Sequence, residues 1–116
     1  MQVGSYLEDK DKSILYELSK SSSLWERRIA IMATFYFIKK NQFTDTLQIS
    51  KQLLTDQEDL IHKAVGWMLR EIGKQNLSAE TDFLKSHYKT MPRTMLRYAI
   101  EKFGKEERQK YLKGMI

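Results

Sequence analysis

The sequence predicts an all-α protein, an α-solenoid of stacked antiparallel helix pairs with about six or seven helices. Apolar residues recur with helical spacing along the whole chain, and no segment alternates apolar and polar residues long enough to indicate a strand. A short motif also recurs three times at nearly constant intervals, which is typical of similar helix pairs that stack on one another.

Residues that favour helix ends divide the N-terminal half of the chain. Ser23 is placed to cap the second helix, and Thr55 and Glu58 have the spacing of a capping box at the start of the fourth. In the C-terminal half, Ser78 is the expected cap of the fifth helix and Pro92 fits the first turn of the sixth. The expected helices span residues 11–19, 24–40, 44–54, 56–74, 78–90, 92–103 and 105–113.

The recurring motif places a basic residue within two positions of an alanine. Its copies are at residues 28–31, 62–65 and 97–100. Ala30, Ala64 and Ala99 are therefore 34 and 35 residues apart. A small residue followed by a branched apolar one suits a close helix crossing, and the basic residues would line up along one side of a solenoid. An ordinary bundle of two helix pairs and a further segment is the alternative.

The expected core consists of aliphatic and aromatic residues at helical spacing. They are Phe35, Tyr36, Ile38, Leu47, Ile49, Leu53, Leu54, Leu69, Leu84, Leu96 and Phe103. Met32, Met68 and Met95 are expected to fill gaps between helices, because the methionine side chain is flexible and adapts to irregular spaces.

Length and composition indicate one small globular domain over residues 1–116. The chain is 41% hydrophobic and 30% charged, and it contains no apolar run long enough to span a bilayer. Residues 1–12 are polar and unlike a signal peptide, so we expect a cytoplasmic protein. The absence of cysteine excludes disulfides and thiolate metal sites, and His62 and His87 are too far apart for a local metal motif. We therefore expect no metal and no cofactor.

Positive charge is concentrated near the C-terminus. The formal net charge is +5, but residues 84–116 carry +6 and the preceding residues −1. This asymmetry favours a polyanionic partner.

Residues 60–71 are the most informative segment. As one helix, they place Lys63, Trp67 and Arg70 at positions i, i+4 and i+7, and we call these three residues the cation–aromatic stripe. Two cations beside an indole can hold a phosphate backbone and press an aromatic plane against a nucleotide. The alternative is that Trp67 belongs to the core and the cations extend past its edges into solvent. Gly66 weakens the helix by about 1 kcal/mol, so we expect a neighbouring helix or a DNA strand to approach closely there.

This segment, with residues 24–31 (Leu-Trp-Glu-Arg-Arg-Ile-Ala-Ile) and 91–103 (Met-Pro-Arg-Thr-Met-Leu-Arg-Tyr-Ala-Ile-Glu-Lys-Phe), resembles the DNA alkylation repair family. These are AlkD-like DNA glycosylases built from HEAT-like helix pairs. The three blocks follow the family order and cover the chain from about Leu15 onward, but only the C-terminal half of a typical member. The resemblance implies binding of duplex DNA with alkylated bases and excision of N3- and N7-alkylated purines by hydrolysis of the N-glycosidic bond.

The candidate DNA-binding residues come from two arguments. The resemblance places Arg28, Trp67 and Arg70 on the concave DNA-binding face, and repeat position adds three candidates for phosphate contacts. The full set is Arg28, Lys63, Trp67, Arg70, Arg93 and Arg97. Tyr88 and Tyr98 could also touch the backbone or a base, although partly buried tyrosines are common.

The chain lacks the family's catalytic acid. In the family, a carboxylate in a Trp-Asp segment lies beside the lesion, where it can stabilise oxocarbenium-like charge and position a water. That segment precedes the blocks found here. Glu8, Asp9 and Asp11 occupy a polar run typical of a solvated turn, and we expect surface ion pairs from Glu26 and Glu71. We therefore assign no catalytic residue and expect a truncated form, a natural fragment or the product of a split reading frame, inactive alone.

Two other functions remain open at the level of the sequence. The chain could be a helical-repeat scaffold that binds an acidic protein segment, because fold does not fix function. It could instead be a complete enzyme that uses Asp9 or Asp11, which requires catalysis without the family acid. We also expect that the apolar end of the solenoid within residues 1–40 can support self-association.

Overall fold

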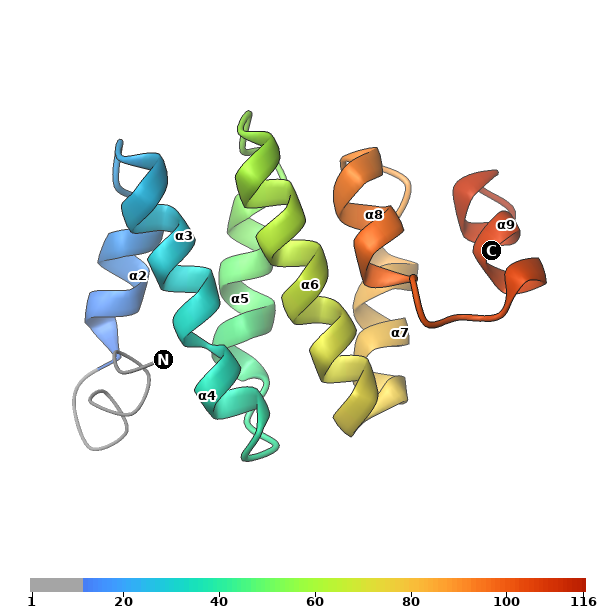
Figure 1. Ribbon diagram of the computed structural model, residues 1–116, viewed down its shortest axis with the longest axis horizontal. Coiled ribbons are helices and arrows are strands. Elements are labelled where there is room, and N and C mark those ends of the chain that lie inside the picture. The colour runs from blue at the N-terminus through green and yellow to red at the C-terminus, as the bar shows by residue number, and fades with distance from the viewer. Residues whose placement is uncertain (1–11) are drawn as a thin grey trace.

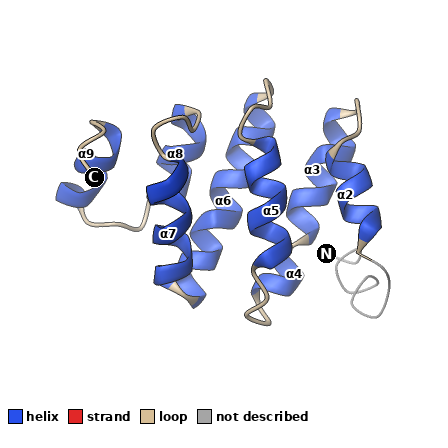
Figure 2. Ribbon diagram, turned by 180° about the vertical axis from the view of Figure 1, so that it is seen from behind, coloured by secondary structure: helices blue, strands red, loops and turns tan. Residues whose placement is uncertain are grey.

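Two layers of helices make up residues 12–116, the part of the chain that the computed structural model describes. One layer contains α3, α4, α6 and α8; α2, α5 and α7 lie behind it, and α9 stands at the far end of the row (Figures 1 and 2). The helices are α2 (Ser13–Ser19), α3 (Leu24–Ala33), α4 (Phe35–Ile38), α5 (Thr44–Leu53), α6 (Asp59–Gln75), α7 (Leu77–His87), α8 (Arg93–Ala99) and α9 (Lys105–Leu112). The described residues contain no strand. The prediction of an all-α helical-repeat fold is confirmed.

The helices α2–α3, α5–α6 and α7–α8 form antiparallel pairs, while α4 continues in the direction of α3 (Figure 1). Ala30, Ala64 and Ala99 are buried on α3, α6 and α8, the second helices of these pairs. The copies of the sequence motif therefore occupy equivalent helices of one layer. Because alanine is small, α6 can pack closely between α3 and α8.

The core is centred on α6, which packs against α3, α4, α5, α7 and α8. Its buried residues follow helical spacing, as one apolar face requires. They include Ile61, Val65, Met68, Leu69 and Ile72, all fully enclosed. Each such side chain stabilises the fold by roughly 1.5–3 kcal/mol through burial alone.

All the predicted core residues are buried or partly buried, so the predicted core is confirmed. Six of its members are fully buried and five are partly buried against them. The partly buried ones are Phe35, Tyr36, Leu47, Leu54 and Phe103. Of the three methionines expected to fill gaps, Met68 and Met95 are fully enclosed and Met32 is partly buried.

Gly66 lies where α8 crosses α6. A Cβ atom at this position would be 2.5 Å from the Met95 carbonyl oxygen and 2.6 Å from Tyr98 Cβ. Only a residue without a side chain permits this approach, since the obstructing atoms include backbone. The expected close approach is therefore made by a neighbouring helix.

Two predicted helix limits in the N-terminal half are wrong. The helix expected over 24–40 is divided at Thr34, whose buried hydroxyl donates to the Ile31 carbonyl oxygen (2.6 Å) while its backbone N–H makes an i−3 bond to the same oxygen. The helix expected from Asp56 begins at Asp59, without the Thr55 capping box. The Asp56 carboxylate instead accepts from Arg27 Nε of α3 (2.7 Å) and from the Glu58 N–H (2.9 Å), which holds it in the loop.

Helix limits in the C-terminal half differ by smaller amounts. α7 is capped by Asn76, whose side chain accepts from the Ala79 N–H (3.2 Å), so the expected cap at Ser78 lies inside the helix. α8 ends at Ala99, and a turn in which the Phe103 N–H donates to the Ile100 carbonyl replaces the predicted last turn. The cap at Ser23 is confirmed, since its side chain accepts from the Glu26 N–H (3.4 Å). The start predicted at Asp11 lies outside the described residues.

Candidate nucleic-acid interface

The cation–aromatic stripe lies on the side of α6 that is not buried in the core. Trp67 is 38% exposed, and the side chains of Lys63 and Arg70 are 44% and 19% exposed. The opposite side of α6 is buried in the core, so the stripe occupies the open side of the layer. The alternative in which Trp67 is a core residue is wrong.

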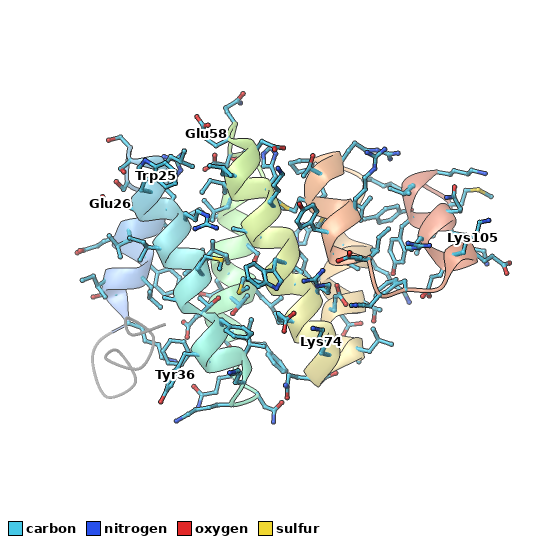
Figure 3. The ribbon with its side chains drawn as sticks, viewed as in Figure 1. Trp25, Glu26, Tyr36, Glu58, Lys74 and Lys105 are labelled. Atoms are coloured by element: carbon cyan, nitrogen blue, oxygen red, sulfur yellow. The ribbon has the colours of Figure 1, made fainter. Side chains whose placement is uncertain are left out.

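A second part of the same layer is contributed by α3. Arg28 lines a shallow hollow of about 220 Å³ with Trp25, Ile29 and Met32. Trp25 is 61% exposed and Ile29 37%, so apolar surface is open to solvent here. Trp25 lies near the start of α3, while Lys74 marks the end of α6 (Figure 3). Arg28 forms no hydrogen bond or ion pair with residues 12–116 and is free to contact a ligand.

Carboxylates already neutralise the cations of the stripe. The Arg70 guanidinium forms an ion pair with Glu101 of the α8–α9 connection, and its Nε lies 3.8 Å from Glu71. Lys63 pairs with Asp59 one turn earlier (3.3 Å). Glu71 also binds Lys74 (3.0 Å), so the expected surface pair of Glu71 is confirmed, whereas Glu26 accepts from the Ser21 hydroxyl instead of a cation. A phosphate at Arg70 must displace Glu101.

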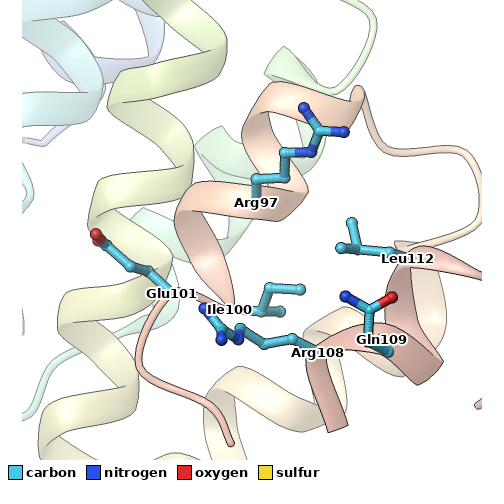
Figure 4. Close-up of a pocket in the computed structure, with 6 residues that line it drawn as sticks. All are labelled: Arg97, Ile100, Glu101, Arg108, Gln109 and Leu112. Atoms are coloured by element: carbon cyan, nitrogen blue, oxygen red, sulfur yellow. The ribbon is translucent and has the colours of Figure 1, made fainter. Parts of the chain in front are cut away.

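Arg93 and Arg97 lie apart from the stripe and face α9. Arg93 donates from Nη1 to the Leu112 carbonyl oxygen (2.6 Å) at the end of α9. Arg97 lines a cleft between α8 and α9 (Figure 4). Sequence position alone grouped these arginines with Arg28, but the structure brings them together at the C-terminal end of the layer.

The two tyrosines considered for nucleic-acid contact differ in exposure. Tyr98 is 38% exposed on α8, beside Gly66 of α6, and adds a second aromatic surface near the stripe. Tyr88 is 5% exposed, and its hydroxyl donates to the Ile116 carbonyl oxygen (2.9 Å). Tyr88 therefore has a structural role at the C-terminus.

Behind Arg70 lies a buried carboxyl group that sequence reasoning missed. Glu80 of α7 is 1% exposed, and its Oε2 has no hydrogen-bond partner among the described residues, nor has Arg70 Nε. A side chain at Gly73 would overlap the carboxyl group, so that glycine provides its space. Burial raises the pKa of Glu80 to about 8, although nearby Arg70 acts in the opposite direction. The sequence contained an indication of this burial, because Glu80 shares one face of α7 with the buried Phe83 and Leu84 at helical spacing.

The family of DNA alkylation repair enzymes matches the chain over residues 2–103. The match covers most of the sequence. The chain belongs to the DNA alkylation repair enzyme family. No curated protein and no solved structure is significantly similar to it. The match begins before Leu15, where the motif blocks placed its start, and it ends before α9.

Glu8, Asp9 and Asp11 lie outside the described residues. Within residues 12–116, no group of three histidine or acidic side chains is arranged to hold a metal ion. None of the helices in that range combines the length and apolar character needed to cross a bilayer.

Proposed function

We propose that this member of the DNA alkylation repair family binds duplex DNA carrying alkylated bases through the open side of the α3–α6–α8 layer. The observation that carries the proposal is the exposure of Trp67 between Lys63 and Arg70 on α6, in the same layer as the unpaired Arg28 of α3. An exposed indole between cations is poorly explained by core packing, whereas it suits a sugar–phosphate backbone and a base.

Each group has a distinct part in this proposal. Lys63, Arg70 and Arg28 contact phosphates after Arg70 exchanges Glu101 for a phosphate oxygen. Trp67 contacts the nucleotide with its ring face, and a positively charged alkylpurine adds cation–π attraction to that contact. The known chemistry of the family, excision of N3- and N7-alkylated purines, then requires little more than stabilisation of sugar cation character and a placed water.

We further propose that the chain is the C-terminal part of a HEAT-like glycosylase domain, cytoplasmic and inactive alone. The described carboxylates around Arg70 all have structural roles, and Glu101 is its ion-pair partner. Glu71 pairs with Arg70 and Lys74, and Glu80 is buried behind Arg70. Incubation with methylated duplex should release no free 7-methylguanine. Release that is abolished by Asp9→Asn or Asp11→Asn would instead show a complete enzyme.

Fluorescence anisotropy of a labelled duplex at several salt concentrations tests DNA binding. The logarithm of the binding constant should fall linearly with the logarithm of the salt concentration, with a slope of about −0.9 per phosphate contact. Trp67→Ala should weaken binding by about 1–3 kcal/mol without changing the slope, as loss of a stacking contact does. Arg70→Gln should weaken binding and reduce the slope by about 0.9.

The matched controls are Lys51→Gln on α5 and Lys85→Gln on α7. Each control removes one positive charge, as Arg70→Gln does. Both lysines are exposed on helices of the opposite layer, away from the proposed interface. Equal effects of Arg70→Gln and the two controls would contradict the proposed interface. A wild-type chain that binds no duplex at low salt would contradict the proposed function itself.

One observation favours a second function, the protein-binding scaffold. The hollow at Trp25, Ile29 and Met32 is lined mostly by apolar side chains and lies on exposed α3. Exposed apolar surface of this kind is typical of protein contacts, including contacts between copies of one chain. Sedimentation of wild type and Trp25→Ser distinguishes the two functions: a dimer lost in the variant, with DNA binding absent from both, would favour the scaffold.

A further inference from the structure

The helix α9 is fixed against the rest of the fold at several points. Tyr111 is 2% exposed and packs edge-on against Tyr88, with ring centroids 5.3 Å apart. Arg93 of α8 binds the Leu112 carbonyl oxygen, and the Tyr88 hydroxyl contacts both backbone groups of Ile116. These contacts set the position of α9 relative to α8 before any ligand arrives.

Between these two helices an open cleft of about 320 Å³ remains. Ile100, directly after the end of α8, and Leu112 of α9 line it and form an apolar floor, with Gln109 beside them (Figure 4). Arg97 extends from α8 at one end of the cleft and Arg108 from the first turns of α9 at the other, while Glu101 points away, toward its partner on α6 (Figure 4). The cleft therefore has an apolar middle and a guanidinium at each end.

Among the described residues, both guanidinium groups lack an anionic partner. Within residues 12–116, neither Arg97 nor Arg108 forms a hydrogen bond or an ion pair, and the remaining carboxylate of the cleft, Glu101, is engaged by Arg70. Arg108 is half-buried, whereas Lys105 and Lys110 of the same helix are exposed. A half-buried arginine without a partner keeps its charge in a poorly solvated position, where an incoming anion is bound more strongly than at the surface.

We propose that the α8–α9 cleft binds the sugar–phosphate backbone of the DNA duplex, with Arg97 and Arg108 on phosphates and a sugar over Ile100 and Leu112. The occupant follows from charge and shape: two cations flank an apolar surface, as phosphates flank a sugar, and residues 84–116 carry a net charge of +6. α9 lies outside the residues matched to the family, so Arg108 is an addition to the matched part of the interface. This inference rests on the proposed DNA binding.

The position of the cleft sets the design of the experiment. The described part of the molecule is 41 Å long, which corresponds to about 12 base pairs at 3.4 Å per base pair. The helices that border the cleft, α8 and α9, stand at one end of the row (Figure 1). A labelled duplex of about 20 base pairs therefore reaches both the cation–aromatic stripe and the cleft, and anisotropy is recorded over a salt series.

Arg108→Gln is compared with Lys110→Gln, a matched removal of one charge from the same helix at a residue that does not line the cleft. Arg108→Gln should weaken binding severalfold and reduce the salt slope by about 0.9, while Lys110→Gln should change affinity less than twofold. Thermal unfolding of both variants should match wild type, because neither side chain forms a hydrogen bond or an ion pair within residues 12–116.

Equal effects of the two substitutions would overturn the cleft as a backbone site and leave binding at Trp67 and Arg70 standing. Binding of an acidic peptide that depends on Arg108, with duplex binding unchanged in Arg108→Gln, would overturn it in favour of a protein ligand. A wild-type chain that binds no duplex at low salt would overturn both this inference and the proposed function.

Discussion

Replacing Glu80 with glutamine should make the stability of the fold much less dependent on pH. Glu80 is a fully buried carboxyl group whose Oε2 has no hydrogen-bond partner among the described residues. Glutamine has nearly the same shape as the protonated acid and cannot ionise. The substitution therefore removes the titration while it keeps the packing against Gly73.

The sign and size of the effect follow from proton linkage. Burial raises the pKa of Glu80 from 4.5 to about 8, so the folded chain binds this proton more tightly than the unfolded chain. The stabilisation is fully present below pH 4.5 and is lost as the pH rises toward 8, because folding must then take up a proton. The loss reaches at most about 1.4 kcal/mol per pH unit and becomes smaller as the pH approaches 8, so it amounts to about 2 kcal/mol between pH 6 and pH 8.

Urea denaturation of both proteins at several values between pH 6 and pH 8 measures this difference. The free energy of unfolding of wild type should fall with pH relative to that of Glu80→Gln. His87, whose pKa is lowered by burial and by nearby Lys51, contributes equally to both proteins and cancels in the comparison. A constant difference between the two proteins across this range would refute the argument that Glu80 is protonated in the fold.

Two further substitutions test other contacts. Gly66→Ala should lower the free energy of unfolding by about 1–2 kcal/mol, since overpacking against the α8 backbone outweighs the gain in helix propensity. The control in thermal unfolding is Gly104→Ala, where a Cβ meets nothing within 4 Å. Equal stability of the two variants would contradict the close approach of α8 to Gly66. Glu101→Gln should tighten duplex binding by about two- to fivefold in anisotropy, because it releases Arg70 from a surface ion pair. Glu106→Gln removes the same charge from α9, and an equal gain there would show a general electrostatic effect.

Local spacing was sufficient to predict the helices and the cation–aromatic stripe. The apolar face of α6 and the i, i+4, i+7 placement of Lys63, Trp67 and Arg70 depend on one helix alone, so both could be predicted from the sequence. The repeat also identified α3, α6 and α8 as equivalent helices. The DNA-binding role of these residues stays a prediction.

Features that depend on contacts between distant segments could not be predicted. α6 begins at Asp59 because Arg27 of α3 holds Asp56 in the loop, across 29 residues of sequence. Arg93 and Arg97 were grouped with the stripe because their repeat positions matched, but only the packing of α9 beside α8 shows that they face α9. The burial of the Glu80 carboxyl group away from solvent likewise depends on the packing of α7 against α6 at Gly73.

The central position of α6 has a consequence for the free energy of ligand binding. Helices at the two ends of the row each have fewer neighbours, so they should open locally and exchange their amide hydrogens first. Trp67 and Arg70 belong to α6, which should open last, and Trp67 directly follows Gly66, where α8 packs closely against α6. A ligand that contacts these side chains meets a surface already ordered, and little of its binding energy is lost to ordering the backbone beneath it.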